Sequence, residues 1–205
     1  MCLAPACLRN KQLYSPIFAP VTDNANMEAL NYKYLPHYVY ADYVQWEGRW
    51  ELIQGVPYAM SPAPVRYHQR VNTRIITQLS NLLENCKQCE ASIYLDFKIA
   101  EDTVLQPDAL VICEPFEDTG FITKAPVIVF EILSPSTRGK DLNLKYGIYE
   151  KAGVSYYVVV DPIKKTCAVF HLQDGVYKAV FNTETGEFDL DIGRRPIRFD
   201  FGRIW

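Results

Sequence analysis

The segment Val127–Leu133 constrains the fold of this chain most, because it places one carboxylate inside an otherwise apolar run of β-branched and aromatic residues. Alternate residues of a strand share a face, so Val127, Val129 and Glu131 are expected to point together. An unpaired buried carboxylate costs several kcal/mol, or its pKa rises until it is neutral. The segment therefore predicts a buried strand whose Glu131 meets a cation or hydrogen-bond donors.

Hydrophobic periodicity and turn residues predict the other elements. Asp141 is expected to cap a helix, and Gly153 to supply the left-handed residue after that helix. The order of elements indicates an α/β protein with a mixed sheet and a helix on each face. The expected elements are a helix over 40–48, a hairpin over 49–60 turning at Gln54-Gly55, a helix over 65–84, strands over 92–99, 109–113 and 127–133, a helix over 141–152, strands over 155–160 and 166–172, and a β-rich tail.

The N-terminal part of the chain differs in pattern from the rest. Residues 1–34 mix prolines with a polar stretch, so we expect an arm or extension followed by one domain over 35–205. Met27 is a second candidate start, because organised sequence follows it. No basic leader with an adequate apolar run precedes Cys7, and no apolar run approaches the length of a membrane span. We therefore expect a cytoplasmic protein with no membrane partner.

Charge restricts the binding partners that the chain can have. It carries 24 acidic and 21 basic residues, a formal net charge of −3. Proteins that bind nucleic acid without sequence preference normally carry a basic stripe. Contact with nucleic acid must therefore rest on a local basic cluster and should be weak.

The cysteines are expected to be reduced structural thiols. Cys86-Lys-Gln-Cys89 is a lone CxxC without a second pair at zinc-finger spacing. It lies at the end of a predicted helix, where the dipole disfavours a thiolate. The alternative is a thiol redox protein, whose reactive cysteine would titrate well below ~8.5.

A second carboxylate stands at the start of another apolar strand, since Asp108 directly follows Pro107. If the two strands are neighbours, Asp108 and Glu131 converge and can hold a hard divalent cation, with their carboxyl groups within about 6 Å. The alternative is that Glu131 pairs with a buried arginine or lysine and Asp108 caps a turn.

A basic loop and helix follow Glu131. Arg138 and Lys140 precede Asp141 and Lys145, which are four residues apart on one helical face continued by Tyr149. A lysine beside a metal-bound water can orient that water and stabilise charge developing on phosphate. The alternative for Asp141 and Lys145 is a surface ion pair worth less than ~1 kcal/mol.

Short motifs occur in a fixed order along the chain. They are Arg49-Trp-Glu51-Leu-Ile-Gln-Gly55, Pro-x-x-x-His68, Pro107-Asp108, Glu131-Ile-Leu-Ser134-Pro-Ser-Thr, Asp141-x-x-x-Lys145-x-x-x-Tyr149, Gly153-Val-x-Tyr-Tyr and Val-Asp161-Pro162. This set resembles the Uma2 family (DUF820), common in cyanobacteria, of the PD-(D/E)XK restriction-endonuclease-like superfamily. The resemblance covers roughly residues 37–172. It implies an αβββαβ core, here with an extra N-terminal hairpin and a β-rich tail, a Mg²⁺ or Mn²⁺ site, and hydrolysis of DNA phosphodiester bonds.

The resemblance also assigns the central residues of the site. Asp108 matches the aspartate of the first motif and Glu131 the acid of the second. The lysine expected two residues later is replaced by Leu133, and Lys145 is the candidate for a relocated lysine, as in the family's own pattern. We expect Lys145→Ala to abolish cleavage while leaving the fold and metal affinity nearly intact. Glu51 fits an additional metal-binding acid, or alternatively a solvent-facing hairpin residue.

The remaining residues receive supporting roles. Arg138 and Lys140 are expected to contact the DNA backbone. His68 is expected to cap or pack at its helix start rather than to take part in catalysis. Asp141 and Tyr149 would support the metal ligands.

The sequence therefore predicts a Mg²⁺-dependent endonuclease acting on DNA, and a two-fold dimer would most easily cut both strands. The alternative is a catalytically silent nucleic-acid or protein-binding module on a nuclease scaffold. Metal binding by the purified protein separates the two.

Overall fold

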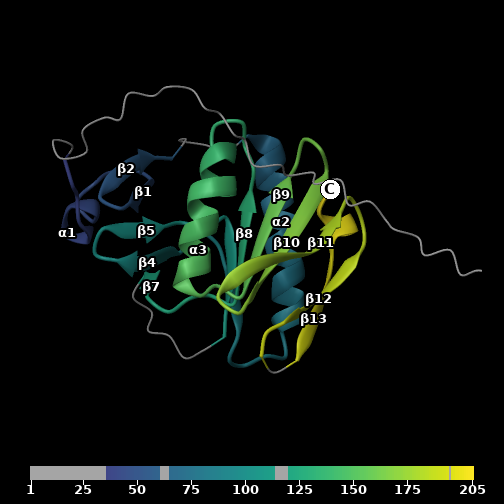
Figure 1. The fold of residues 1–205 in the computed structure, drawn as a ribbon. Helices are drawn as coiled ribbons and strands as arrows, with labels where there is room; N and C mark the ends of the chain where they lie inside the picture. Colours follow the sequence, from purple (N-terminus) through teal and green to yellow (C-terminus); the bar gives the residue numbers. More distant parts are fainter. Residues whose placement is uncertain (1–35, 61–64, 114–119, 194) are drawn as a thin grey trace, which may run out of the picture. The chain divides into compact units, whose positions relative to one another are not determined.

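The computed structural model describes residues 36–60, 65–113, 120–193 and 195–205 (Figure 1). The predicted arm over residues 1–34 lies outside these ranges.

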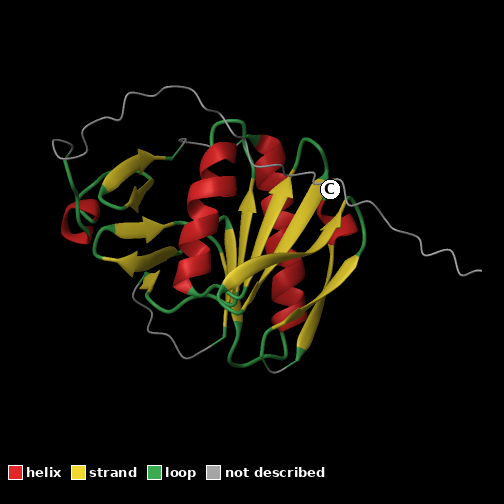
Figure 2. Ribbon diagram, in the orientation of Figure 1, coloured by secondary structure: helices red, strands yellow, loops and turns green. Residues whose placement is uncertain are grey.

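A six-stranded mixed sheet forms the centre of the described domain (Figure 2). Its only parallel pair is β8 and β9, and the other neighbouring strands run antiparallel. Parallel neighbours need a long crossover connection, which the helical segment between β8 and β9 provides. The strand order is β11 (Val176–Thr183), β10 (Thr166–Gln173), β9 (Tyr156–Asp161), β8 (Ile128–Ile132), β6 (Ala109–Ile112) and β3 (Glu90–Ser92).

Helices cover both faces of this sheet, as the order of elements indicated (Figure 1). On one face α2 (Arg66–Leu83) buries its apolar stripe together with the hairpin of β12 (Glu187–Asp191) and β13 (Pro196–Asp200). On the other face α3 (Tyr146–Ala152) packs Tyr149 against the strands. The predicted mixed α/β fold with a helix on each face of the sheet is therefore confirmed.

The N-terminal hairpin belongs to a second sheet rather than standing alone. Gln54 and Gly55 both have positive φ, at 50° and 78°, as a tight two-residue hairpin turn requires, so this predicted turn is confirmed. The hairpin adds its first strand to β5, and residues of this sheet complete the apolar cluster around α3. The order is β2 (Val56–Ala59), β1 (Trp50–Ile53), β5 (Thr103–Leu105), β4 (Asp96–Ala100) and β7 (Phe121–Ile122).

The single strand predicted over residues 92–99 is wrong, because the chain changes sheets within it. Ser92 ends β3 in the central sheet, and Asp96 begins β4 in the second sheet. Tyr94 between them adopts a φ of 56°, a left-handed conformation that turns the backbone. The helix expected over 40–48 is also shorter than predicted, since α1 covers Tyr40–Tyr43.

The helix predicted over 141–152 begins three residues earlier, at Arg138, and contains a wider turn. Residues Lys140–Lys145 form a π-helical turn, η2, which continues directly into α3 and ends at Gly153 with a φ of 86°. Asp141 makes no capping hydrogen bond, so the predicted N-cap is wrong, and its side chain is buried. A π-helical turn bonds residues five apart, which places Lys140 and Lys145 one above the other.

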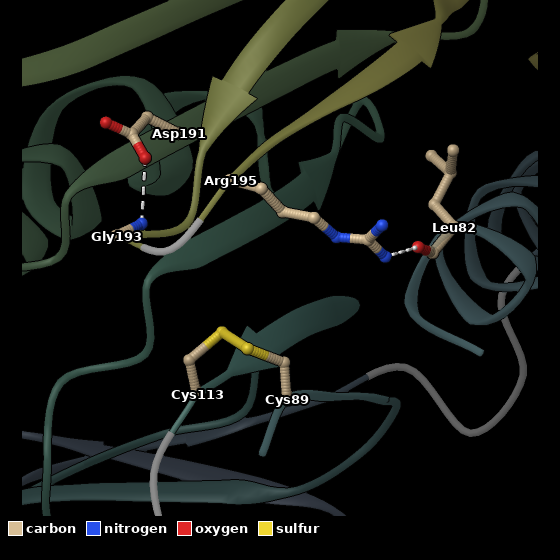
Figure 3. The surroundings of a disulfide bond; sticks show 6 residues. All are labelled: Leu82, Cys89, Cys113, Asp191, Gly193 and Arg195. Atoms are coloured by element: carbon tan, nitrogen blue, oxygen red, sulfur yellow. Dashed lines mark hydrogen bonds between the residues drawn. A yellow bond between two sulfur atoms is a disulfide. The ribbon is translucent and has the colours of Figure 1, made fainter. Parts of the chain in front are cut away.

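Cys89 forms a disulfide with Cys113, so the expectation of reduced thiols is wrong for this residue (Figure 3). In the antiparallel pair of β3 and β6, Glu90 faces Ile112, and the next pair in this register is Cys89 and Cys113. Cys86 remains a free thiol beside α2. Strand pairing therefore decides the partner of Cys89. The alternative of a thiol redox protein required a Cys86–Cys89 pair, which this disulfide excludes.

A buried carboxylate–lysine cluster as candidate active site

Strand pairing brings Asp108 and Glu131 to neighbouring positions. Ala109 of β6 faces Phe130 of β8, so Asp108 and Glu131 are the next residues opposite one another in this antiparallel register. Glu131 alternates with Val129 and Leu133, both of which belong to the apolar cluster around α3. The two acids therefore lie at one end of the paired strands, where Glu131 contacts η2 and α3 and Asp108 contacts α2.

Lys145 is the centre of the site. Its ammonium lies 2.9 Å from Glu131 Oε1, 2.6 Å from Glu51 Oε1 and 3.6 Å from Asp141 Oδ1. The side chain is almost entirely buried, with 2% of the residue exposed. Glu131 thus meets a buried lysine, which was the alternative considered for this strand. The alternative of a surface ion pair between Asp141 and Lys145 is excluded, because both side chains are buried.

Glu51 joins the cluster from the second sheet. It is completely buried in β1, and both its carboxylate oxygens accept lysine ammonium groups, Oε1 from Lys145 and Oε2 from Lys140. The alternative of a solvent-facing hairpin residue is therefore excluded. The wide turn of η2 allows two lysines five residues apart to reach the same carboxylate.

Tyr149, one turn further along α3, donates a hydrogen bond of 2.7 Å to Glu131 Oε1. Its hydroxyl is fully enclosed, and burial together with the neighbouring carboxylate of Glu131 raises its pKa well above the ordinary value. The phenol therefore stays protonated and acts as a fixed donor that orients Glu131.

The cluster carries more negative than positive charge. Three buried carboxylates, those of Glu51, Glu131 and Asp141, contact two lysines, a formal excess of one negative charge when all are ionised, and a fourth, Asp108, lies beside His68. Burial raises the pKa of Glu131 well above its usual range, opposed by Lys145. Burial also raises the pKa of Asp141, whereas Glu51 keeps a lowered pKa because the two lysines outweigh its burial. The carboxylates are Glu51, Asp108, Glu131 and Asp141.

Asp108 is held from two sides. Its Oδ2 accepts the backbone N–H of Ile132 at 2.8 Å and lies 3.2 Å from Nε2 of His68. The side chain of Asn72, also on α2, donates to the Asp108 carbonyl at 2.9 Å. Burial alone would lower the pKa of His68, but the hydrogen bond and charge of Asp108 raise it. His68 is buried at the helix start, as expected, and it also contacts the predicted site directly.

The predicted basic segment does not form a free surface patch. Arg138 Nη1 lies 2.6 Å from Asp161 Oδ2, and Lys140 is bound to Glu51. Both cations pair with buried carboxylates, because a buried carboxylate without a partner is costly. Arg138 and Lys140 are thus each paired with an acidic side chain, and their contact with the DNA backbone stays a prediction.

We expect Asp161→Asn to lower the free energy of unfolding by about 1.5–3 kcal/mol at neutral pH, because Asp161 accepts charged and backbone hydrogen bonds. Burial by itself would raise the pKa of Asp161, but bonds from Arg138 and from the backbone of Lys164 hold it below the ordinary value. An acid with a lowered folded pKa stabilises the protein above its unfolded pKa, and this contribution is lost as the pH falls.

Denaturant unfolding should therefore show the deficit of Asp161→Asn at pH 7 and a smaller deficit below about pH 4. Asp174→Asn, at an exposed position on the β10–β11 turn, is the matched control. A deficit of the same size at both pH values would contradict the ionic role of Asp161.

Exposed arginines on α2 form a basic stripe that was not among the basic residues predicted from the sequence. Arg66, Arg70 and Arg74 are spaced four residues apart on the solvent side of α2, and none forms an ion pair with a described residue. The helix contains no acidic residue. The spacing of the arginines was the signal that could have revealed them. The stripe begins in the helical turn that also carries His68, next to Asp108.

The donor set of the cluster fits a hard divalent cation. Within the described ranges, no three His, Cys, Asp or Glu side chains are already arranged as a complete metal cage. Mg²⁺ does not need one, since one or two carboxylates with water and phosphate usually hold it. The hydrogen bonds of the described residues use Oδ2 of Asp108 and Oε1 of Glu131, and Asp141 Oδ1 is buried without a hydrogen bond.

None of the helices in the described ranges has the length and apolar character needed to cross a membrane.

Comparison with known proteins places the chain in a family. Residues 40–191 match the family model Uma2, described as "Putative restriction endonuclease". An uncharacterized protein of Synechocystis sp. is 28% identical over 142 residues, covering 65% of this chain and 73% of the relative. A crystal structure described as "a putative nuclease belonging to DUF820 from Anabaena variabilis" superposes with a TM-score of 0.65 at 17% identity, over 81% of this chain and 96% of that one. The match to the family model spans most of the domain that carries the cluster, and the chain belongs to the Uma2 family of restriction-endonuclease-like proteins.

Proposed function

We propose that this protein is a metal-dependent endonuclease that hydrolyses DNA phosphodiester bonds with Mg²⁺ or Mn²⁺. The observation that carries the proposal is the buried cluster of Glu51, Glu131 and Asp141 around two lysines, with Asp108 opposite Glu131 on the neighbouring strand, inside a chain of the Uma2 family. Burying several carboxylates together costs several kcal/mol unless cations compensate them, and a bound metal ion would add to the compensation that the lysines provide.

Asp108 and Glu131, with Glu51, would hold the ion. When bound, the ion would lower the pKa of its water ligand and offset charge at the scissile phosphate. Tyr149 fixes the orientation of Glu131 through its hydrogen bond. Each assignment uses a carboxylate whose position in the sheet is already set by strand pairing.

Lys145 would act as a charged hydrogen-bond donor and not as a base. Burial alone would lower its pKa, but the surrounding carboxylates Glu131, Glu51 and Asp141 raise it well above the ordinary value. The ammonium therefore keeps its proton at neutral pH. It can orient the attacking water and stabilise negative charge that develops on the phosphate.

The arginine stripe on α2, made of Arg66, Arg70 and Arg74, would bind the DNA backbone together with Arg138 and Lys140. Its side chains are exposed and lie on the helix that contacts Asp108 through His68. Few phosphate contacts and a net negative protein predict weak binding that falls steeply with salt.

The test of this function is cleavage of plasmid DNA and of circular single-stranded DNA by the purified protein. We expect nicked or linear products with Mg²⁺ or Mn²⁺ and none with a chelator, because the ion supplies the nucleophilic water. Endonucleolytic cutting of circles excludes an exonuclease contaminant. Intact circles with both metals, under conditions in which the protein is folded, would contradict the proposal.

A second candidate is a silent binding module that keeps the scaffold. The observation that favours it is that the Lys145 ammonium already contacts three carboxylates. Part of the negative charge of the cluster is therefore neutralised without a metal ion. Melting of the protein with and without Mg²⁺ or Mn²⁺ separates the candidates. A binding ion stabilises the folded state by mass action, whereas a silent module without a metal site would melt at the same temperature in both.

A further inference from the structure

A pocket of about 280 Å³ lies beside the carboxylate–lysine cluster. Four partly exposed aromatic rings surround it, and neighbouring rings contact one another, with centroids 5.9 Å apart for Tyr40 and Tyr43, 5.7 Å for Tyr43 and Trp46, and 5.5 Å for Trp46 and Trp50. Three of these residues lie in or just after α1, and Trp50 begins β1. Pockets for drug-sized molecules span roughly 300–1,000 Å³, so this one suits a single planar ring system.

The pocket also has a polar wall. Asp96 Oδ2 accepts the Tyr43 hydroxyl at 2.8 Å, and Asp96 Oδ1 accepts the side-chain amide of Gln106 at 2.9 Å. The amide oxygen of Gln106 in turn accepts Nε of Arg49 at 2.7 Å. A carboxylate, an amide and a guanidinium are thus fixed side by side, and together they offer both donors and acceptors.

Gln106 connects this pocket to the carboxylate–lysine cluster. Its side chain bonds to Asp96 in the pocket, and its backbone N–H donates to Glu51 Oε1 at 3.2 Å in the cluster. Pro107 and Asp108 follow directly in the chain as it passes from β5 to β6. A molecule held by Asp96 and the rings therefore lies beside the groups that would perform hydrolysis.

We propose that this pocket binds one unpaired nucleobase of the strand that is cut, so that the substrate is single-stranded or locally unpaired DNA. This inference rests on the proposed function and narrows its substrate class. Aromatic rings stack any base without regard to sequence, and the polar wall matches the hydrogen-bonding edge of a base. The Asp96 carboxylate offsets the charge of the Arg49 guanidinium in the same wall, so the pocket has no net positive charge that would favour a phosphate over an uncharged base.

Duplex DNA does not offer such a base. The edge that the polar wall would bind is occupied by pairing, and the faces that the rings would cover are stacked on neighbouring bases. A base must be extruded at a cost of a few kcal/mol, unless the strand is already unpaired. The pocket should therefore favour single strands over duplexes of the same sequence.

The experiment measures binding of a short single-stranded oligonucleotide and of its duplex to the full chain, with a chelator present so that no cleavage occurs. Quenching of tryptophan fluorescence reports occupancy, since Trp46 and Trp50 are two of the three tryptophans. We expect Trp46→Ala to weaken single-strand binding about 5- to 150-fold, the loss that removal of one stacking ring produces. Label-based anisotropy is measured in parallel, because the variant lacks one reporter.

Two further variants keep the result interpretable. Trp46→Phe retains a stacking ring and should bind within about threefold of wild type, since much of the stacking face remains. Trp205→Phe changes a tryptophan that packs against the α2-side core and does not line the pocket, so it should bind as wild type. Melting curves establish that each variant is folded.

Equal affinity for single strand and duplex, or wild-type affinity of a folded Trp46→Ala protein for single strands, would overturn the inference. Its failure is distinct from failure of the proposed function, because binding is measured without metal. Tight, Trp46-dependent single-strand binding by a protein that cuts no DNA would support the pocket and contradict the nuclease. Cleavage of DNA by a protein that binds single strands and duplexes equally would support the nuclease and contradict the pocket.

Discussion

Asp108→Asn is expected to lower the rate of DNA cleavage by at least about 10³-fold, because a metal ion contributes several kcal/mol of transition-state stabilisation and each 1.4 kcal/mol is a factor of ten. The substitution removes the charge of a proposed metal ligand while keeping its size. An asparagine amide oxygen can still accept the backbone N–H of Ile132, which Asp108 Oδ2 accepts now. The variant should therefore fold, and the metal-induced rise in melting temperature should shrink with the activity.

Asp189→Asn is the matched control for this substitution. Asp189 lies on β12, is exposed and pairs with Arg198 at the surface, so its loss should leave both cleavage and the metal effect unchanged. A folded Asp108→Asn protein that cuts DNA at more than a tenth of the wild-type rate would remove Asp108 from the proposed metal site.

Lys145→Met is expected to destabilise the fold by about 3–5 kcal/mol at neutral pH, the cost of breaking a buried ion pair by removing one partner. The variant leaves Glu131, Glu51 and Asp141 with one ammonium, that of Lys140, instead of two. The expected loss of stability differs from the sequence-based prediction that substitution of Lys145 leaves the fold nearly intact. That expectation treated the lysine as a residue acting only on water and phosphate.

The pH dependence of the deficit gives a second measurement. Burial already raises the pKa of Glu131 and Asp141, and loss of the neighbouring ammonium raises both further. Carboxyl groups with raised folded pKa values stabilise the protein when protonated, and this contribution is lost as the pH rises. The deficit of Lys145→Met in denaturant unfolding should therefore grow between about pH 5 and pH 8, a window that begins just above the ordinary carboxyl pKa.

Lys164→Met, at an exposed position after β9, should show no deficit at either pH. Added Mg²⁺ should recover part of the stability of Lys145→Met, because a divalent ion can compensate the buried carboxylates that have lost their ammonium partner. A Lys145→Met protein as stable as wild type at pH 8 would show that the ammonium does not balance the cluster.

The elements that local pattern defines were predictable in type and nearly in extent. The period of α2, the hairpin turn at Gln54-Gly55 and the left-handed Gly153 each depend on a few consecutive residues, and all three are confirmed. The prediction of a single strand over 92–99 was wrong because its residues suit a strand in either of two sheets. Only the pairing of Ser92 with Leu110 and of Phe97 with Leu105 decides where each half belongs.

The candidate site divides in the same way. The sequence by itself determined that Glu131 is a carboxylate inside an apolar strand and needs a partner, because alternation along a strand and the cost of burying charge are local facts. Only the tertiary structure decided which residues are its partners. Glu51 arrives from another sheet, the wide turn of η2 points Lys140 and Lys145 at it, and Cys89 meets Cys113 across a strand pair. Strand register and the competition of buried acids for nearby cations set these contacts, and both act between residues far apart in the chain.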